Sequence, residues 1–435
     1  MSLRPNIIYL HTHDTGRHIQ PYGAPVPTPR IQRLAEEGVL FLNAFSAAPT
    51  CSPSRAGLLT GSSPHSCGML GLAHRGFTLH DYGQHLVHTL GPAGYHTAMV
   101  GQQHVAPGPL EGEVIGYDEQ LLIDGDRAAA VIPAALDFLD RATDQPFFLS
   151  IGLVETHTLT SGTGTFGYPG ADDRYVAPPP TMPSLPETRS DMASFAAAAQ
   201  VVDDGVGAVL DRLAERGLAD QTLVILTTDH GVAMPRMKST LTDLGTGVML
   251  IIRGPGGFTG GRVIEPLVSQ LDLFPTLCDL LGLDPPDWLE GTSLLPLLAG
   301  ETDSVHDVVF SEVNYHVSYE PMRAARTTRW KYIRQFSDWG RPVLANVDDS
   351  PSKQVWLDAG WRDQAVAHEQ LYDLLFDRWE QRNLAADPEY ADVLATLSTE
   401  VRSWMERTRD PLLDGPLPPP PGPPPLSQAA TSPDE

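Results

Sequence analysis

The chain has 435 residues, with 54 acidic and 29 basic side chains and a formal net charge of −25. This excess of negative charge disfavours nucleic acid and anionic membrane surfaces as partners, and we expect neither. The apolar fraction of 41% is typical of a globular protein, and chains longer than about 300 residues usually fold as more than one domain.

The sequence contains no run of about 18 apolar residues, so no membrane-spanning helix is expected. The N-terminal segment MSLRPNIIYLHTHD enters a strand-like run without the apolar core of a signal peptide, so we expect a cytoplasmic location. The cysteines, Cys51, Cys67 and Cys278, are too few for a disulfide framework. A bridge between Cys51 and Cys67 is allowed by their spacing, but nothing favours it.

Strand-like and helix-like segments alternate through the first two thirds of the chain. We expect strands at 6–13, 95–101, 146–155, 222–231 and 248–256, and helices at 28–41, 191–217 and 268–283. Apolar strands that alternate with helices predict an α/β fold with a mostly parallel sheet covered on both faces.

The pattern changes after residue 305, where a few short strands and a terminal helix follow. We therefore expect a catalytic α/β domain at 1–305 and a smaller α+β domain at 306–412. The Pro-rich tail at 413–435 includes PLPPPPGPPPLSQAATSPDE. This composition is typical of polyproline and disordered segments, and we expect the tail to be flexible.

Two apolar strands end in the same pair of residue types, His13–Asp14 and Asp229–His230. Functional groups gather beyond the carboxyl ends of strands in open α/β sheets, so these pairs predict a site for one divalent cation. Carboxylates suit Ca²⁺, Mg²⁺ or Mn²⁺, whereas imidazole favours Mn²⁺ or Zn²⁺. The alternative is that Asp14 and Asp229 cap the turns that follow them.

Histidines follow two further strands, His104 after MVGQQ and His157 after GLVET. Histidine is the natural proton carrier near neutral pH, and these positions predict the rim of an active site. The alternative for each is a hydrogen-bonded structural histidine. Cys51 has two readings of its own, a nucleophile activated at a helix N-terminus or an inert buried side chain.

The string CSPSRAGLLTG at 51–61 resembles the signature of the sulfatase family, C-x-P-S-R followed closely by T-G. The segments RPNIIYLHTHDTG, GYHTAMVGQQHV and TLVILTTDHG resemble further family segments and occur in the same order. Within the family the likeness is greatest to the heparan N-sulfatase (sulfamidase) subgroup. The resemblance implies an alkaline-phosphatase-like fold, a three-layer α/β/α sandwich with a smaller C-terminal α+β subdomain.

The resemblance also implies roles for individual residues. Cys51 would be oxidised to formylglycine by a formylglycine-generating partner, and Arg55 would orient the aldehyde. His104 would help to deprotonate the hydrated aldehyde, while His157 and Lys238 would hold the sulfate oxygens and protonate the leaving group. The implied metal ligands are His13, Asp14, Cys51, Asp229 and His230. Ca²⁺ is the expected ion, with Mn²⁺ and Mg²⁺ as alternatives.

Two residues depart from the family pattern. His13 replaces one of a pair of acids at the first metal strand, and Gln102 replaces a lysine that binds sulfate. We expect Arg17 to supply the missing cation. His316 and Arg323 either contact the sugar or pack within the C-terminal domain.

The resemblance implies a sulfatase that hydrolyses a sulfate ester or an N-sulfate (sulfamate) on a sulfated sugar such as N-sulfoglucosamine. The first alternative is a phosphonate monoesterase or phosphodiesterase of the same alkaline phosphatase superfamily. The others are an inactive sulfatase-like binding protein and a cysteine hydrolase that uses Cys51 as a thiolate. A homo-oligomer is compatible with the sequence.

Overall fold

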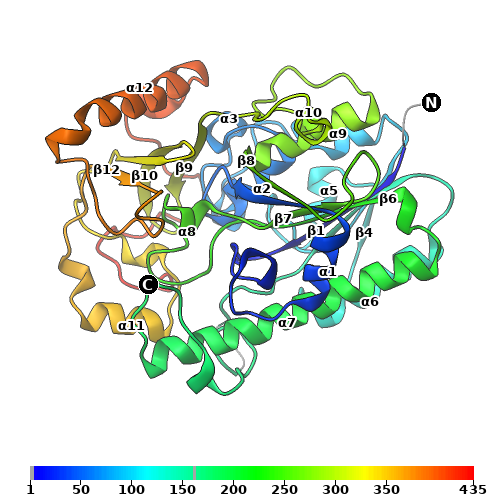
Figure 1. Ribbon diagram of the computed structural model, residues 1–435, viewed down its shortest axis with the longest axis horizontal. Helices are drawn as coiled ribbons and strands as arrows, with labels where there is room; N and C mark the ends of the chain where they lie inside the picture. Colours follow the sequence, from blue (N-terminus) through cyan, green and yellow to red (C-terminus); the bar gives the residue numbers. More distant parts are fainter. Residues whose placement is uncertain (1–3, 160–162) are drawn as a thin grey trace.

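Two β-sheets organise the chain (Figure 1). The computed structural model describes residues 4–159 and 163–435. The larger sheet has eight strands in the order β4-β3-β5-β1-β6-β7-β2-β8. Its strands are β1 (Asn6–Thr12), β2 (Val39–Phe45), β3 (His96–Gly101), β4 (Glu119–Leu121), β5 (Phe147–Gly152), β6 (Thr222–Thr228), β7 (Leu250–Arg253) and β8 (Arg262–Ser269).

Neighbouring strands of the larger sheet run parallel, with β7 as the exception. This strand pairs antiparallel with both β6 and β2, whereas the other neighbours pair in parallel. The predicted mostly parallel sheet is therefore confirmed. Every residue of β6 is buried, as expected of a strand covered on both faces.

Helices cover both faces of the larger sheet, giving three layers. The helices of the chain are α1 (Pro29–Glu37), α2 (Cys51–Thr60), α3 (Pro64–Cys67), α4 (Val87–Leu90), α5 (Glu111–Ile115), α6 (Ala128–Arg141), α7 (Pro186–Glu215), α8 (Asp243–Thr246), α9 (Leu273–Leu281), α10 (Leu295–Ala299), α11 (Pro351–Asp358) and α12 (Ala391–Arg407). On one face, α7 contacts both α1 and α6. On the other, α2 contacts α3 and α9.

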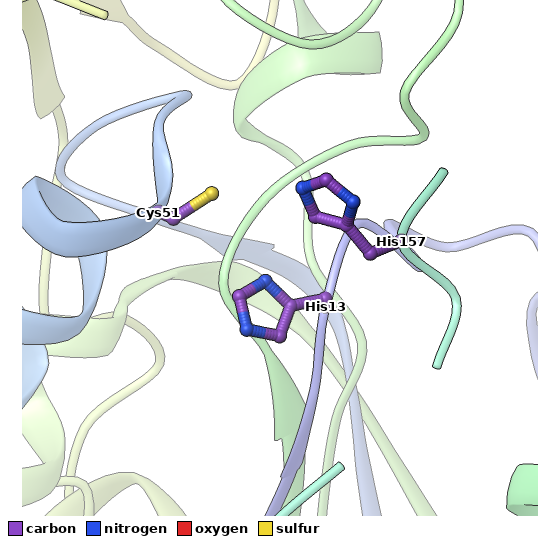
Figure 2. A group of neighbouring side chains, drawn as sticks. All are labelled: His13, Cys51 and His157. Atoms are coloured by element: carbon purple, nitrogen blue, oxygen red, sulfur yellow. The ribbon is translucent and has the colours of Figure 1, made fainter. Parts of the chain in front are cut away.

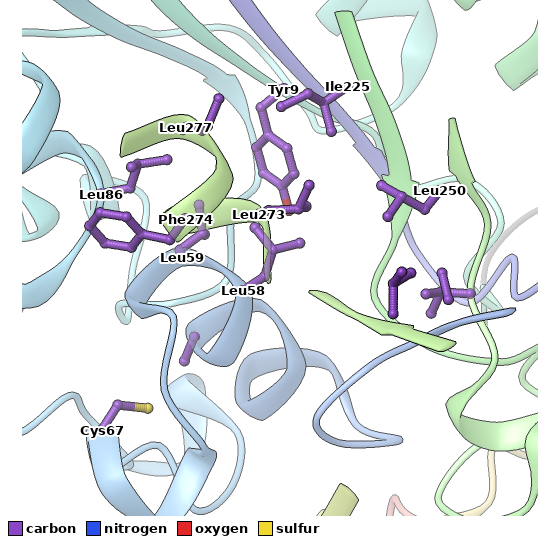
Figure 3. Close-up of a cluster of buried hydrophobic side chains, with 14 of the residues drawn as sticks. Tyr9, Leu58, Leu59, Cys67, Leu86, Ile225, Leu250, Leu273, Phe274 and Leu277 are labelled. Carbon is purple, nitrogen blue, oxygen red and sulfur yellow. The ribbon is translucent and has the colours of Figure 1, made fainter. Parts of the chain in front are cut away.

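Alternate residues of the central strands supply the two cores. Ile8 of β1 is buried on the α7 side with Val206, while Tyr9 belongs to the core beneath α2 and α9. Figure 3 shows Tyr9 among leucines of those helices, including Leu58 and Leu273. Burial of each such side chain stabilises the fold by roughly 1.5–3 kcal/mol, so the two cores hold the sheet edge that carries the site in place.

The helix predicted at 28–41 is too long, because α1 ends at Glu37 and β2 begins at Val39. The helix α7 begins earlier than predicted, at Pro186, and has 30 residues. By length and composition alone α7 could cross a membrane, but 67% of its apolar window is buried inside the protein. Its apolar residues thus serve the core.

The smaller sheet is antiparallel, in the order β12-β11-β10-β9. Its strands are β9 (Val309–Tyr315), β10 (Tyr319–Arg326), β11 (Trp330–Gln335) and β12 (Glu369–Asp373), and α12 packs on β10 and β11. A small C-terminal α+β unit is therefore present, while the exact boundaries at 305 and 412 stay predictions.

The Pro-rich tail, which its composition predicts to be flexible, packs in part against the smaller sheet and the segments beside it. Leu417 and Ala430 are buried. The backbone N–H of Leu426 donates to the carbonyl of Val317 at 2.8 Å. A polyproline segment makes no internal hydrogen bonds, so its backbone groups are available to neighbouring segments.

Candidate functional site

The carboxyl ends of four parallel strands meet at one edge of the larger sheet. The strands β3, β5, β1 and β6 are consecutive neighbours in the sheet. The predicted strand-end residues are thus brought to one place, as the sequence pattern indicated. These residues are His13, Asp14, Gln102, His104, His157, Asp229 and His230.

Asp14 and Asp229 are joined directly. The backbone N–H of Asp14 donates to Oδ1 of Asp229 at 2.9 Å, and the backbone of Asp14 is left-handed, with φ of 52°. A non-glycine residue in this region is strained and persists where its surroundings hold it. Oδ1 of Asp14 lies 3.2 Å from Nε2 of His230, so both predicted strand-end pairs contribute to one cluster.

Cys51 is the first residue of α2 and is only 2% exposed. Its Sγ lies 3.4 Å from Nε2 of His230. Figure 2 shows the sulfur directed toward the imidazole rings of His13 and His157. Burial raises the pKa of the Cys51 thiol well above its usual value, with Lys238 acting in the opposite sense. The thiol form is favoured, which argues against the cysteine-hydrolase alternative.

The residues at this edge fit a divalent cation. One donor atom each from His13, Asp14, Cys51 and Asp229 lies within 4.8 Å of the others. Among the described residues, both ring nitrogens of His13 and Oδ1 of Asp14 lack a hydrogen bond of good geometry, although Nδ1 of His13 lies 3.3 Å from Oδ2 of Asp229 and Oδ1 of Asp14 lies 3.2 Å from Nε2 of His230. Buried polar atoms normally have partners, and a cation would supply one.

The protonation states also fit a cation. Burial, with help from Arg55, lowers the pKa of His13 well below its usual value, which leaves a neutral ring with a free lone pair. Burial works to raise the pKa of Asp229, but His230, Arg55 and His13 outweigh it and hold this pKa well below its usual value. Asp229 is therefore a carboxylate.

Arg55 holds one of these carboxylates. Its Nε and Nη2 donate to Oδ2 of Asp229 at 3.2 and 3.0 Å. Nη2 also donates to the carbonyl of Thr12, and Nη1 bonds Nδ1 of His11. Such a fork fixes the carboxylate in both position and orientation.

Lys238 forms a buried network with two acids and a histidine. Its Nζ lies 3.0 Å from Oδ2 of Asp14, 2.9 Å from Oδ2 of Asp348 and 3.5 Å from Nε2 of His157. Burial works to lower the pKa of Lys238, but Asp14 and Asp348 outweigh it and hold this pKa well above its usual value. Lys238 is therefore a fixed positive charge beside Cys51.

His104 pairs with a second histidine. Its Nε2 lies 2.9 Å from Nδ1 of His74, and the two rings are stacked with centroids 5.2 Å apart. The backbone N–H of His104 donates to Glu111 at 2.7 Å, and φ of His104 is 64°. Burial, with a contribution from His74, lowers the pKa of His104 well below its usual value, so the ring is neutral and can accept a proton.

His316 lies among the charged groups of the candidate site. It is buried, and the charges that act on it are those of Lys238, Asp348, His230 and His157. Burial, followed by Lys238, lowers the pKa of His316 well below its usual value. The structure thus favours the site reading of His316 over packing elsewhere in the C-terminal domain.

Arg17 and Arg323, two predicted substrate-binding residues, are held by protein partners, and for Arg323 this is the alternative of packing within the C-terminal domain. Arg17 donates to the carbonyl of Ala44 and stacks on the ring of Phe45 at 4.6 Å, so it does not supply the missing cation. Arg323 is fully buried and pairs with Asp410. Both guanidinium groups are held by protein partners, which removes them from a substrate pocket.

Gln102 follows β3 and is half-buried. Within residues 4–159 and 163–435, its side chain makes no hydrogen bond to the site. A Cβ built on Gly152 would lie 2.0 Å from the carbonyl oxygen of Gln102, so glycine is required where this turn passes β5. A substrate contact of Gln102 stays a prediction.

Sequence reasoning missed three residues of the site. His11 lies inside β1 and bonds Arg55, while His74 and Asp348 lie in connecting segments. The strand-end pattern has no signal for loop residues. His11 could have been predicted as a site residue, because it is a histidine near the end of an apolar strand.

The comparisons agree with this geometry. A family model described as Sulfatase matches residues 5–283, and one described as N-sulphoglucosamine sulphohydrolase, C-terminal, matches residues 238–357. The N-sulphoglucosamine sulphohydrolase of Homo sapiens is 30% identical over 464 residues, covering 94% of this chain and 92% of that protein. An ulvan-active sulfatase of Formosa agariphila is 27% identical, covering 94% and 76%.

A solved structure has the same fold. The solved protein, which was determined in complex with its substrate D-glucosamine-2-N,6-O-disulfate, superposes on this chain with a TM-score of 0.72 at 19% identity. The match covers 95% of this chain and 99% of the solved one.

Proposed function

Because the chain belongs to the sulfatase family and is a sulfuric ester hydrolase, we propose that it removes sulfate from a sulfated sugar at Cys51. The proposed substrate class is a sugar N-sulfate (sulfamate) or sulfate ester, with N-sulfoglucosamine first. The match to the C-terminal model of N-sulphoglucosamine sulphohydrolases supports this order.

One observation carries the proposal. The only cysteine of a sulfatase-like signature begins α2 with donor atoms of His13, Asp14 and Asp229 within 4.8 Å. Converted to formylglycine and hydrated, residue 51 would offer two hydroxyl groups on one carbon, one as the nucleophile and one to expel sulfate. A divalent cation held by His13, Asp14, Asp229 and residue 51 would polarise a hydroxyl and the sulfate oxygens.

The roles of the remaining side chains follow from their charge and exposure. Lys238 stays protonated, so it binds a sulfate oxygen rather than exchanging its proton. His157 lies 3.5 Å from Lys238, and its side chain is 29% exposed. His157 is therefore the donor that faces a departing oxygen or nitrogen. Neutral His104 accepts a proton and is held by His74 and Glu111.

A substrate panel tests the proposal. N-sulfoglucosamine, an O-sulfated glucosamine and an aryl phosphonate are compared with the purified full chain, and the peptide that contains residue 51 is weighed by mass spectrometry. Conversion of cysteine to formylglycine lowers that mass by about 18 Da. Activity on the sulfated sugars together with this mass supports the proposal. Faster turnover of the phosphonate, or full activity with an intact thiol, overturns it.

The metal is tested separately by elemental analysis of the active protein. We propose one ion per chain, Ca²⁺ first because Asp14 and Asp229 offer carboxylate oxygens, and Mn²⁺ second because the imidazole of His13 stands beside them. A protein that is fully active after complete removal of divalent ions contradicts this proposal.

A further inference from the structure

The last ten residues of the chain, 426–435, form an ordered strap that crosses from the smaller sheet toward the site. The side-chain amide of Gln428 donates to the carbonyl of Tyr319 and to Oγ of Ser337, both at 2.8 Å. Oγ of Ser432 donates to a carboxylate oxygen of Asp349 at 2.5 Å. The strap is therefore anchored along its length.

Three of its anchors are the immediate neighbours of site residues. Val317, which bonds Leu426, follows His316 in the chain. Arg75 follows His74 and donates to the carbonyl of Pro433 at 3.4 Å. Asp349 follows Asp348, the partner of Lys238. Attachment at these three points brings the strap against three separate segments of the site wall.

The strap also touches the nucleophile's own surroundings. Ala430, which is 8% exposed, shares one apolar cluster with Cys51, Leu72, Val317 and Ala345. The side chain of Lys238 is 1% exposed and that of His157 is 29% exposed. The site is thus closed around Cys51 and opens toward His157, with the strap forming part of the closed side.

The strap carries negative charge at its end. Asp434 and Glu435 are exposed, and Asp434 acts on Arg75 strongly enough to oppose the lowering of the Arg75 pKa by burial. A long chain with many sulfates would meet these carboxylates on a protein that already has a net charge of −25. A single sulfated unit carries far less charge past them.

We propose that the strap, residues 426–435, is a wall of the substrate pocket that restricts the enzyme to a single sulfated sugar unit and excludes longer anionic chains. This inference rests on the proposed function for its substrate class. Its steric part depends only on access to Cys51.

The steric part is tested without turnover, in protein produced where Cys51 remains a thiol. The intact chain and a variant ending at Pro425 are alkylated with iodoacetamide and with a bulky polyethylene glycol maleimide, and labelled peptides are counted by mass. We expect truncation to accelerate the maleimide reaction at Cys51 much more than the iodoacetamide reaction. Buried Cys67 is the internal control. Unchanged labelling of Cys51, or equal acceleration at Cys67, overturns the proposal.

The specificity part is tested with converted enzyme. We expect truncation to raise the ratio of kcat/KM for a sulfated oligosaccharide to kcat/KM for the sulfated monosaccharide by about tenfold, as expected when a pocket wall is removed. A ratio that stays constant overturns the proposal. If no sulfated sugar is hydrolysed by either protein while Cys51 labelling accelerates, the proposed function fails and the wall stands.

A charge variant in the full-length chain covers the case in which truncation prevents folding. Asp434→Lys is compared with Glu400→Lys, which makes the same charge change at an exposed position of α12. We expect only Asp434→Lys to raise kcat/KM for the oligosaccharide, by about threefold at low salt, with the gain lost at high salt. Equal effects of both variants would overturn a specific role of the strap.

Discussion

Two buried clusters of ionisable groups differ in how completely their atoms are partnered. The active-site cluster consists of His13, Asp14, Cys51, Asp229 and Lys238. The structural cluster consists of His65, Glu312, Arg323 and Asp410, where the N-terminal domain meets the smaller sheet. In each cluster the donor atoms of the histidine, the acids and, in the first, Cys51 lie within 4.8 Å of one another.

The structural cluster balances its own charge. Nη2 of Arg323 donates to Asp410 at 3.0 Å, and its Nε lies 3.3 Å from Glu312. Burial works to lower the pKa of His65, but Glu312 outweighs it and raises this pKa. Two cations therefore face two carboxylates, and no carboxylate oxygen of this cluster lacks a partner among the described residues. Its one unpartnered side-chain atom among these residues is Nε2 of His65, which carries a proton when the ring is charged and so offers no lone pair.

The active-site cluster contains buried polar atoms that have no hydrogen bond to the described residues. Oδ1 of Asp14 and both ring nitrogens of His13 have no hydrogen bond within the described chain. The difference teaches that proximity of acids and histidines does not by itself identify a cation site. Unmatched lone pairs identify it, because a balanced ion network has none to offer.

The largest expected effect is at Cys51. Cys51→Ala should lower kcat on a sulfated substrate by about 10⁴-fold or more, because the nucleophile is lost. The thermal midpoint, measured by circular dichroism, should change little. Cys278→Ala removes another buried thiol and should retain activity, so an equal loss in both variants would refute the assignment.

Two carboxylates contact Lys238, but only Asp14 is a proposed metal ligand, so neutralising each one in turn distinguishes loss of the metal from loss of charge. Asp14→Asn should reduce kcat/KM by about 10²–10³-fold and lower the bound divalent metal, measured by elemental analysis. Asp348→Asn, which also loses a contact to Lys238, should retain the metal. Full metal content in Asp14→Asn would contradict the ligand assignment.

A substitution in the structural cluster should lower the free energy of unfolding and leave kcat unchanged. Arg323→Met leaves two buried carboxylates without their partner and should cost about 3–5 kcal/mol of unfolding free energy, measured in urea. The folded fraction should keep its kcat. A drop in kcat at temperatures where the variant is fully folded would restore Arg323 to the substrate pocket.

The smallest expected effect is a pH dependence of stability through His65. Since its folded pKa is raised, protonated His65 stabilises the protein fully below the unfolded pKa of about 6.5. This contribution is lost as pH rises through the folded pKa. The difference in unfolding free energy between the native chain and His65→Gln should therefore shrink at alkaline pH. A difference that grows with pH would show the opposite sign.

The sequence was informative where residues follow strands. A parallel sheet brings the ends of neighbouring strands together, so His13, Asp14, Asp229 and His157 could be assigned to one edge before the structure was known. The strand-end argument does not extend to Arg17. This residue was chosen because it is near Asp14 in the sequence, but nearness in sequence does not determine the direction of a side chain after the strand ends.

Long-range partners carried no such signal. Asp348 reaches Lys238 from the C-terminal domain, and His74 reaches His104 from a connecting segment. The contacts of the tail had no signal in the sequence either, because composition indicates whether a segment can form its own core, whereas Leu426 and Ala430 pack on another one.

The burial of Cys51 limits the time during which a modifying enzyme could reach it. In the folded chain this residue is 2% exposed, so an enzyme that converts it, as the proposed function requires, would need to reach it before the surrounding segments fold. His230 follows Cys51 by 179 positions. At ribosomal rates of about 5–20 residues per second, roughly 10 to 35 s separate their synthesis. Within that interval the site around residue 51 is incomplete, which gives a converting enzyme time to act before the fold closes.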